Sequence, residues 1–309
     1  MSVIEVESLS KYFNGVHAVD GINFSVKKGE IFGFLGPNGA GKTTTIRMMT
    51  GVLKPTSGKI KLFNNDFWKN PISIKQDIGN VPEMANVYGD LTAIQNLELI
   101  GELYGVSKKN RKKLAEDLLI QFELYEKKDF KARKYSKGMK QRLLLCMALM
   151  SSPKILFLDE PTSGLDVQSA IIIKSLIKNY NKQGTTIFLT THDMDVANEL
   201  CDRIAIINEG KIISLDTPEN LKALFQEHQA IDIFFQQQVK SEELKKLSSI
   251  KETKKIKDGW SVIVEDLNEA FLELIEFVKL NGYSIKHMNT HQPSLEEVFL
   301  KIINGGVKN

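Results

Sequence analysis

A short glycine-rich segment constrains the fold of this chain more than any other feature. Residues 36–43 read Gly-Pro-Asn-Gly-Ala-Gly-Lys-Thr, directly after the apolar run 31–35 and at the start of a predicted helix over 42–50. Glycines let a backbone turn tightly with its N–H groups aimed inward, and the following helix adds the positive end of its dipole. This combination indicates a phosphate-binding loop. The strand before it and the helix after it argue against a chance glycine-rich turn.

Individual residues of this loop have predicted roles. Lys42 is expected to reach the β- and γ-phosphates of a nucleotide, and the Thr43 hydroxyl is expected to ligate Mg²⁺. The residues predicted to hold the nucleotide here are Gly36, Pro37, Asn38, Gly39, Ala40, Gly41, Lys42, Thr43 and Thr44.

Two carboxylates follow the apolar run 155–158, which predicts a buried strand. At its end Asp159 would ligate the metal ion, usually through water, and Glu160 would polarise the water that attacks the phosphate. The alternative is that both acids are ordinary solvated side chains at a strand end, and the nearby glycine loop makes this alternative less favourable.

His192 follows a third apolar run, 186–189, and two threonines. A lone histidine is usually structural. This one falls at the carboxyl edge of a predicted parallel strand, where open α/β sheets bind their ligands. We expect it to donate a hydrogen bond to the γ-phosphate.

The order of predicted elements indicates an α/β fold in two domains. Strands 3–6 and 22–26 open the chain, helices fill an insertion at about 91–150, and parallel strands return at 155–158, 186–189 and 203–207. The predicted domains are residues 1–229 and 230–309. The second shows a β-α-β-β-α-β order, which predicts a small ferredoxin-like α+β module. Its last helix, 295–303, carries an apolar stripe of Leu295, Val298, Phe299 and Ile302.

Composition limits the class of partner. A net charge of +3 indicates no dedicated nucleic-acid partner, and no apolar run reaches the roughly 20 residues of a membrane span. We therefore expect a soluble chain that acts on a membrane only through another protein. The two cysteines, Cys146 and Cys201, stand in apolar helical contexts, which predicts buried, reduced thiols.

Together with Tyr135-Ser136-Lys137-Gly138-Met139, these motifs resemble the ATP-binding cassette family over about residues 3–225. The family signature, usually LSGGQ, reads YSKGM here, a variant similar to that of drug, ion or polysaccharide export cassettes. The resemblance implies a P-loop NTPase cassette with an N-terminal antiparallel β subdomain. It also implies ATP and Mg²⁺ as cofactors.

The resemblance also implies a head-to-tail dimer. Ser136 and Gly138 would contact the ATP held by Lys42 of the opposite chain, and Asp166 would lie in a loop at the dimer interface. His192 matches the switch histidine of the family. Phe13 matches the aromatic residue that stacks on adenine, and Val19 is expected to pack against the same base.

One residue departs from the family pattern. Val81-Pro82-Glu83 places a carboxylate where the family usually carries glutamine. Glu83 can ligate Mg²⁺, but it cannot donate a hydrogen bond when ionised.

The leading function is a transport ATPase, as a homodimer or heterodimer, paired with a separate transmembrane permease at the cytoplasmic face of the membrane. Export is favoured by resemblance, and the cargo is not specified by this chain. The alternative is a soluble cassette ATPase acting on ribosomes or DNA. A catalytically dead regulatory cassette would be expected to lack Lys42, Glu160 or His192.

Overall fold

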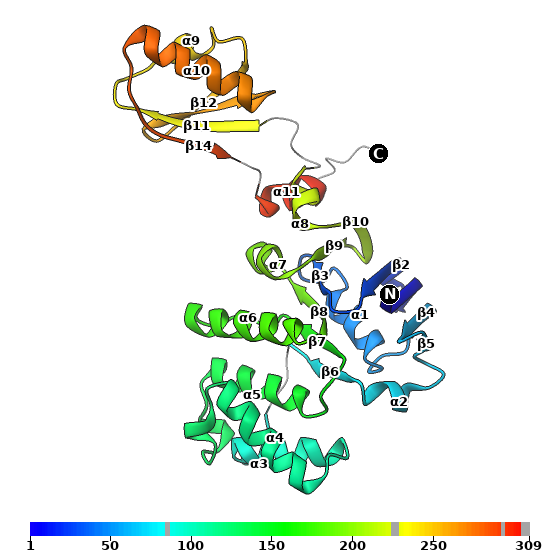
Figure 1. Ribbon diagram of the computed structural model, residues 1–309. Coiled ribbons are helices and arrows are strands. Elements are labelled where there is room, and N and C mark those ends of the chain that lie inside the picture. Colours follow the sequence, from blue (N-terminus) through cyan, green and yellow to red (C-terminus); the bar gives the residue numbers. More distant parts are fainter. Residues whose placement is uncertain (84–86, 224–228, 292–293, 304–309) are drawn as a thin grey trace. The chain divides into compact units, whose positions relative to one another are not determined.

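The computed structural model describes residues 1–83, 87–223, 229–291 and 294–303 (Figure 1). The chain divides into two compact units, Met1–Pro218 and Glu219–Asn309. Each unit buries its own apolar cluster. The predicted boundary, between residues 229 and 230, lies later in the chain and stays a prediction.

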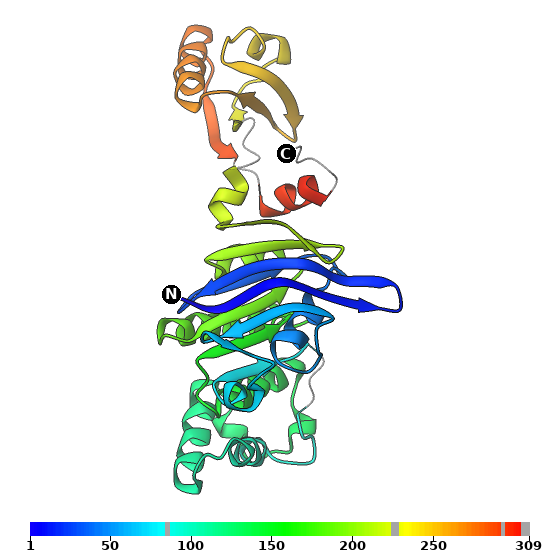
Figure 2. The same cartoon turned by 90° about the vertical axis from the view of Figure 1, so that its right-hand side faces the viewer.

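An antiparallel sheet opens the first unit, in the strand order β2-β1-β4-β5. Its strands are β1 (Ser2–Phe13), β2 (Val16–Lys27), β4 (Ser57–Leu62) and β5 (Asn65–Asp66). Asn14 and Gly15 join β1 to β2 with φ angles of 45° and 86°. Positive φ at both positions is the requirement of the tight hairpin turn whose twist matches the flanking strands. Figure 2 shows this long hairpin alongside the rest of the unit.

A six-stranded sheet forms the centre of the first unit, in the order β10-β9-β3-β8-β7-β6. It comprises β3 (Ile31–Leu35), β6 (Ile78–Val81), β7 (Ile155–Asp159), β8 (Thr186–Thr191), β9 (Arg203–Asn208) and β10 (Lys211–Asp216). All strand pairs are parallel except β10 with β9. Every residue of β3, β7 and β8 is buried, as expected for parallel strands covered on both faces. The carboxyl ends of these three strands therefore meet at one edge.

Helices surround this sheet. They are α1 (Lys42–Met49), α2 (Pro71–Lys75), α6 (Val167–Lys182) and α7 (Met194–Leu200). The predicted helical segment holds α3 (Ala93–Leu103), α4 (Lys108–Gln121) and α5 (Lys137–Leu149), with short 3-10 turns at Tyr125–Lys127 and Ala132–Lys134. Thr92 and Gln95 form a reciprocal capping box at the start of α3. Cys146 and Cys201 are buried and free, as predicted.

The second unit has the predicted β-α-β-β-α-β order. Its elements are β11 (Gln229–Phe235), α9 (Ser241–Leu244), β12 (Ile250–Ile256), β13 (Gly259–Val264), α10 (Leu267–Asn281) and β14 (Ile285–His291), flanked by α8 (Pro218–Ala223) and α11 (Leu295–Ile303). The sheet is antiparallel throughout, in the order β12-β13-β11-β14. On α11, Leu295, Val298 and Phe299 are buried, whereas the Ile302 side chain lies outside the described part of the chain.

Some elements were not predicted. The sequence predicts no counterpart for the strands β4, β5, β6 and β10 or for the helices α2 and α8. The sequence predicts a helix over 241–247, whereas α9 ends three residues earlier, at Leu244. β4 and β10 contain lysines and serines at exposed or partly exposed positions, so they lack the uninterrupted apolar run by which a buried strand is recognised.

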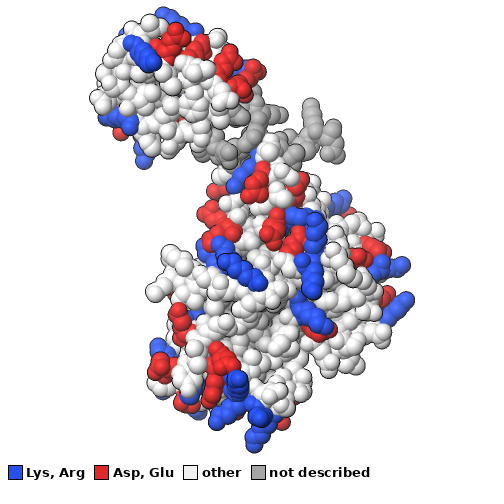
Figure 3. Space-filling model, in the orientation of Figure 1, with Lys and Arg blue, Asp and Glu red and all other residues white. Residues whose placement is uncertain are grey.

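Charged side chains are interspersed on the face shown in Figure 3, with blue and red groups mixed over both units. That face shows no extended field of one sign. Among the described helices, none is both long enough and apolar enough to cross a lipid bilayer.

Candidate active site

The predicted phosphate loop lies at the carboxyl edge of the parallel strands, between β3 and α1. Two of its glycines are required by close contacts. A Cβ on Gly36 would stand 2.3 Å from the Ile207 carbonyl oxygen, and one on Gly41, where φ is 107°, would stand 2.4 Å from the Ala18 carbonyl oxygen. Real side chains do not fit at such distances, so only glycine allows this loop to close. The loop lines a hollow of about 290 Å³.

Lys42 places its ammonium at the centre of this loop. Its Nζ donates hydrogen bonds to the carbonyl oxygens of Gly36 at 2.7 Å and Pro37 at 3.1 Å. The side chain is buried, so its charge is presented to the hollow in a poorly screened environment. An anionic phosphate is the ligand that this loop, with its N–H groups and its lysine, can hold.

Asp159 is held by two hydroxyl groups. Thr43 Oγ1 donates to Asp159 Oδ1 at 3.2 Å, and Thr190 Oγ1 donates to the same oxygen at 2.5 Å. The Thr190 hydroxyl also accepts a hydrogen bond from the backbone N–H of Glu160 at 3.1 Å. Thr190 therefore links the two acidic residues. This role was not predicted, because it depends on the pairing of Asp159 with Thr190 across β7 and β8.

These oxygens suit a hard divalent cation. A hydroxyl from Thr43 and a carboxylate from Asp159 lie in contact beside the loop, and Mg²⁺ prefers oxygen ligands. Within the described ranges there is no group of three or more His, Cys, Asp or Glu side chains that could hold a metal. Mg²⁺ usually binds one or two protein carboxylates and takes its other ligands from water and substrate phosphates.

Glu160 has an unusual backbone and a central position. Its φ of 50° is left-handed, a conformation uncommon outside glycine, and its side chain is only 6% exposed. Glu160 Oε2 lies 2.9 Å from His192 Nδ1, and Oε1 lies 3.3 Å from Lys42 Nζ. The Lys42 contact lacks hydrogen-bond geometry, so Oε1 is a buried acceptor without a hydrogen bond from any described residue. That atom can accept a proton from a water.

His192 contacts Glu160 twice and remains half exposed. In addition to the ring contact, its backbone N–H donates to Glu160 Oε2 at 3.4 Å, and half of its side chain faces solvent. Glu160 and His192 also border a second hollow, of about 480 Å³, with Gly164 and Leu165. The structure thus brings Lys42, Thr43, Asp159, Glu160 and His192 together as one cluster.

Ser136 and Gly138 stand apart from this cluster, at the N-terminus of α5. The Ser136 hydroxyl caps the helix by accepting from the Met139 N–H at 3.2 Å. A Cβ on Gly138 would lie 2.2 Å from Ser169 Oγ, so glycine is also required there by the packing of α6. Neither residue lines the hollow of the phosphate loop.

Asp166 caps α6. Its Oδ1 accepts from the Ser169 N–H at 2.9 Å, and its Oδ2 accepts from the Ser169 hydroxyl at 2.8 Å. The hydrogen bonds from Ser169 lower the pKa of the Asp166 carboxyl, which keeps it ionised as a helix cap. Its predicted place at a dimer interface stays a prediction.

The other residues predicted to contact the nucleotide or the metal ion differ in their exposure to solvent. Phe13 is at the end of β1 and is 43% exposed, with Lys11 Nζ 5.1 Å from its ring centroid. Val19 has no exposed surface and packs beneath the phosphate loop, whereas its neighbour Ala18 lines the hollow. Glu83 is exposed and lines the same hollow. The predicted contacts of Phe13 and Val19 with adenine stay predictions.

Comparisons with known proteins agree with this geometry. A family model described as "ABC transporter" matches residues 19–163, and one described as "ATP-binding protein DrrA1-3-like, C-terminal domain" matches residues 217–303. The bacitracin transport ATP-binding protein BcrA of Bacillus licheniformis is 36% identical over 312 residues, covering 99% of this chain and 98% of that protein. The daunorubicin/doxorubicin resistance ATP-binding protein DrrA of Streptomyces peucetius is 39% identical over 220 residues, 71% of this chain and 67% of that protein.

A solved structure extends the comparison to the fold. The dimeric structure of a post-hydrolysis state of an ATP-binding cassette, bound to ADP and Pi, matches with a TM-score of 0.64 and 29% identity, covering 69% of this chain and 98% of that one. The fold and site thus define a cassette ATPase. The chain belongs to the ATP-binding proteins of ABC transporters, a family whose cassettes dimerise and work with transmembrane subunits.

Within that family, this chain combines one cassette with a DrrA-like C-terminal domain. The predicted family, fold class and ATPase activity are confirmed. None of these relatives supports the alternative of a soluble cassette acting on ribosomes or DNA.

Proposed function

We propose that this chain hydrolyses ATP with Glu160 as the catalytic base, as half of a dimer that drives export through a separate transmembrane permease. The observation that carries the proposal is the buried Glu160 Oε1, which no described residue satisfies with a hydrogen bond. A buried acceptor costs free energy unless something donates to it. A water placed there would give up its proton to Glu160 as it attacks the γ-phosphate.

His192 and Lys42 act on either side of this base. His192 holds Glu160 Oε2 through its ring nitrogen and, being half exposed, can also turn toward the γ-phosphate. Lys42 lies close to both the loop and Glu160, so a bound phosphate would draw its ammonium away from the loop carbonyls. Each movement would report whether the γ-phosphate is present.

Thr43, Asp159 and Glu83 are the proposed ligands of Mg²⁺. The hydroxyl and the Asp159 carboxylate already contact each other, and Glu83 lines the same hollow. When bound with ATP, Mg²⁺ would neutralise charge on the β- and γ-phosphates. An ionised Glu83 accepts but does not donate, so its part would be limited to this cation and its waters.

The dimer is proposed to complete each ATP site. Ser136 and Gly138 lie at the N-terminus of a 13-residue helix, where backbone N–H groups favour an anion. Because they do not line the hollow of their own chain, they would serve the ATP of a second cassette, either identical or related. Asp166 would then lie between the two copies.

Export is proposed from the relatives. BcrA is named as a bacitracin transport protein and DrrA as a daunorubicin/doxorubicin resistance protein. The chain would lie at the cytoplasmic face of the membrane, held there by its permease. The domain after residue 229 is proposed to fold apart from the ATP site.

Glu160→Gln tests this function. Glutamine keeps the shape but is a far weaker base, so the variant should bind ATP, accumulate as an ATP-bound dimer and turn over at least about a hundredfold more slowly. The measurements are steady-state ATPase rate, nucleotide binding and sedimentation with ATP. Hydrolysis at the wild-type rate would show that Glu160 is not the base.

A further inference from the structure

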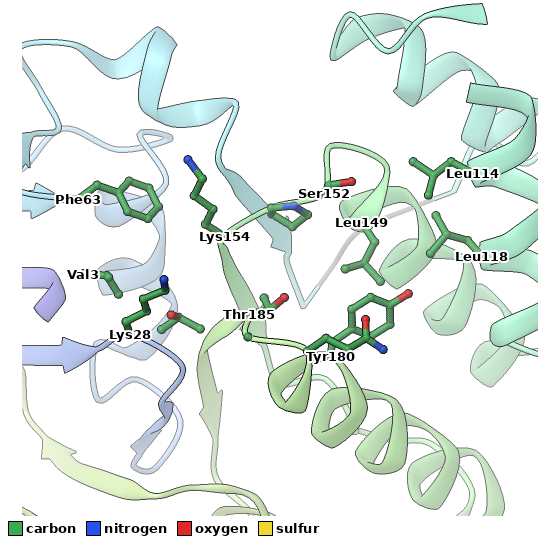
Figure 4. A pocket seen from close by; sticks show the side chains of 14 residues that line it. Val3, Lys28, Phe63, Leu114, Leu118, Leu149, Ser152, Lys154, Tyr180 and Thr185 are labelled. Carbon is green, nitrogen blue, oxygen red and sulfur yellow. The ribbon is translucent and has the colours of Figure 1, made fainter. Parts of the chain in front are cut away.

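A third hollow lies in the first unit, at the sheet edge opposite the phosphate loop. Its volume is about 720 Å³, and residues at the amino ends of β7 and β8 line it (Figure 4). These strands span five and six residues, so at about 3.3 Å per residue the hollow lies roughly 15–20 Å from the catalytic cluster. The proposed ATPase mechanism makes no use of this hollow.

Turns from distant parts of the sequence converge on its rim. Phe63 belongs to the two-residue turn between β4 and β5, where it and Asn64 have φ angles of 53° and 63°, as such a turn requires. Ser152, with a φ of 50°, and Gly184, with a φ of 100°, lie in turns that precede β7 and β8.

The walls are mostly apolar. The aliphatic and aromatic lining includes Val3, Phe63, Leu114, Leu118, Leu149 and Pro153. Figure 4 shows Val3 and Phe63 on one side and Leu114 and Leu118 on the other, with Tyr180 between them. The volume lies within the range of about 300–1,000 Å³ typical of small-molecule sites. Hydrocarbon bound here would remove apolar surface from water, which is favourable.

The charge on the rim is positive. Lys28 and Lys154 are the charged residues among the described residues that line the hollow, and none of these lining residues is a carboxylate. Lys154 is paired with Asp77 at 3.0 Å. Lys28 forms no ion pair with any carboxylate in the described part of the chain. Hydroxyls of Ser152 and Thr185 add hydrogen-bond donors to the same rim. An acidic group on a ligand would therefore find an unpaired cation and donors.

We propose that this hollow is a binding site for a small anionic amphiphile, with its hydrocarbon body against the apolar walls and its carboxylate at Lys28. A partly open apolar hollow, with one ammonium on its rim that pairs with no described carboxylate, favours this class over neutral hydrocarbons and over cations. The site is separate from the ATP site, so both ligands can be bound together.

Decanoate is the test ligand. Binding to the full chain is measured by isothermal titration calorimetry below the micelle concentration, with decyltrimethylammonium as the probe of equal chain length and opposite charge. We expect saturable binding of one decanoate, at least tenfold weaker binding of the cation, and no competition by ATP. Equal affinity for both amphiphiles, displacement of decanoate by ATP, or no saturable binding would each overturn the proposal.

Variants locate the site. Lys28→Glu changes an exposed side chain and should weaken decanoate binding at least tenfold, whereas Lys109→Glu, an exposed lysine of α4 outside the hollow, should leave it unchanged. Leu114→Trp should fill the hollow and abolish binding, and retained ATP binding would show that this variant is folded. Wild-type decanoate affinity in folded Lys28→Glu, or equal losses in Lys28→Glu and Lys109→Glu, would contradict the assignment.

Discussion

Replacing Thr190 by valine tests whether the hydroxyl that joins the two acidic residues supports catalysis. Valine has the same shape, so the change removes the donor to Asp159 Oδ1 and the acceptor of the Glu160 N–H. Glu160 N also contacts the Thr190 carbonyl oxygen at 3.2 Å, so the backbone bond survives. The loss is then one hydrogen bond to a charged group, about 2 kcal/mol. For a unit of this size that corresponds to a fall in Tm of about 4–8 °C.

The same loss uncouples the Asp159 carboxylate from the Glu160 backbone N–H. We therefore expect kcat for ATP hydrolysis to fall about tenfold or more, since 1.4 kcal/mol is a factor of ten. Differential scanning fluorimetry and a steady-state ATPase assay measure the two effects. Thr190→Ser should restore the rate by restoring the hydroxyl. Thr50→Val, which removes a buried hydroxyl bonded to the Ile46 carbonyl oxygen, is the matched control with a neutral acceptor. Wild-type kcat and Tm in Thr190→Val would refute the reasoning, as would a Thr190→Ser variant no better than valine.

Two further predictions concern acidic side chains. Glu83→Ala should weaken the dependence of ATPase activity on Mg²⁺ and slow turnover, whereas Glu83→Gln should have a small effect on both because the glutamine oxygen can still ligate Mg²⁺. Unchanged Mg²⁺ titrations for both variants would show that Glu83 is an exposed loop acid with no role in metal binding. In the second unit, burial raises the pKa of Glu273, but hydrogen bonds from Ser249 and Ser248 outweigh it and lower the pKa to about 2, below its ordinary value of 4.5. A lowered carboxyl pKa adds stability above pH 4.5 that is lost as pH falls toward 2. After a discount for solvent screening, Glu273→Gln should therefore lower the free energy of unfolding by about 1 kcal/mol at pH 7 and by almost nothing near pH 2. Denaturant unfolding at both pH values measures this loss of stability. Glu276→Gln, at an exposed acid of the same helix, is the control. An equal loss at both pH values would contradict the link between the lowered pKa and stability.

Elements with strong local signals could be predicted from the sequence closely. The sequence predicts a helix over 167–182, and α6 has these limits, because Asp166 caps its start and its apolar residues recur with helical spacing. The buried strands β3 and β7 follow from uninterrupted apolar runs. In contrast, β10 lies at the sheet edge, mixes apolar and polar residues and has no buried residue, so its place depends on pairing with β9 and not on its own residues.

The site shows the same division. The phosphate loop, Asp159, Glu160 and His192 could be singled out because each follows a strand and carries a side chain suited to phosphate chemistry. The linking role of Thr190 could not be predicted, since it depends on β7 and β8 lying side by side in register, with Asp159 opposite Thr190. The left-handed backbone of Glu160 and the tight approach of Ser169 to Gly138 likewise arise from tertiary packing.

The composite dimer is the central claim, and a mixing measurement tests it most directly. Ser136→Arg should place bulk and charge against the ATP of the opposite chain, and Lys42→Ala should disable the loop of its own chain. Each variant alone should be inactive. In a one-to-one mixture, a mixed dimer would retain one intact pair of Lys42 and Ser136, so ATPase activity should return to about a quarter of wild type if chains pair at random and sites act independently. A mixture as inactive as its components, or full activity of a monomer in sedimentation during turnover, would contradict the account.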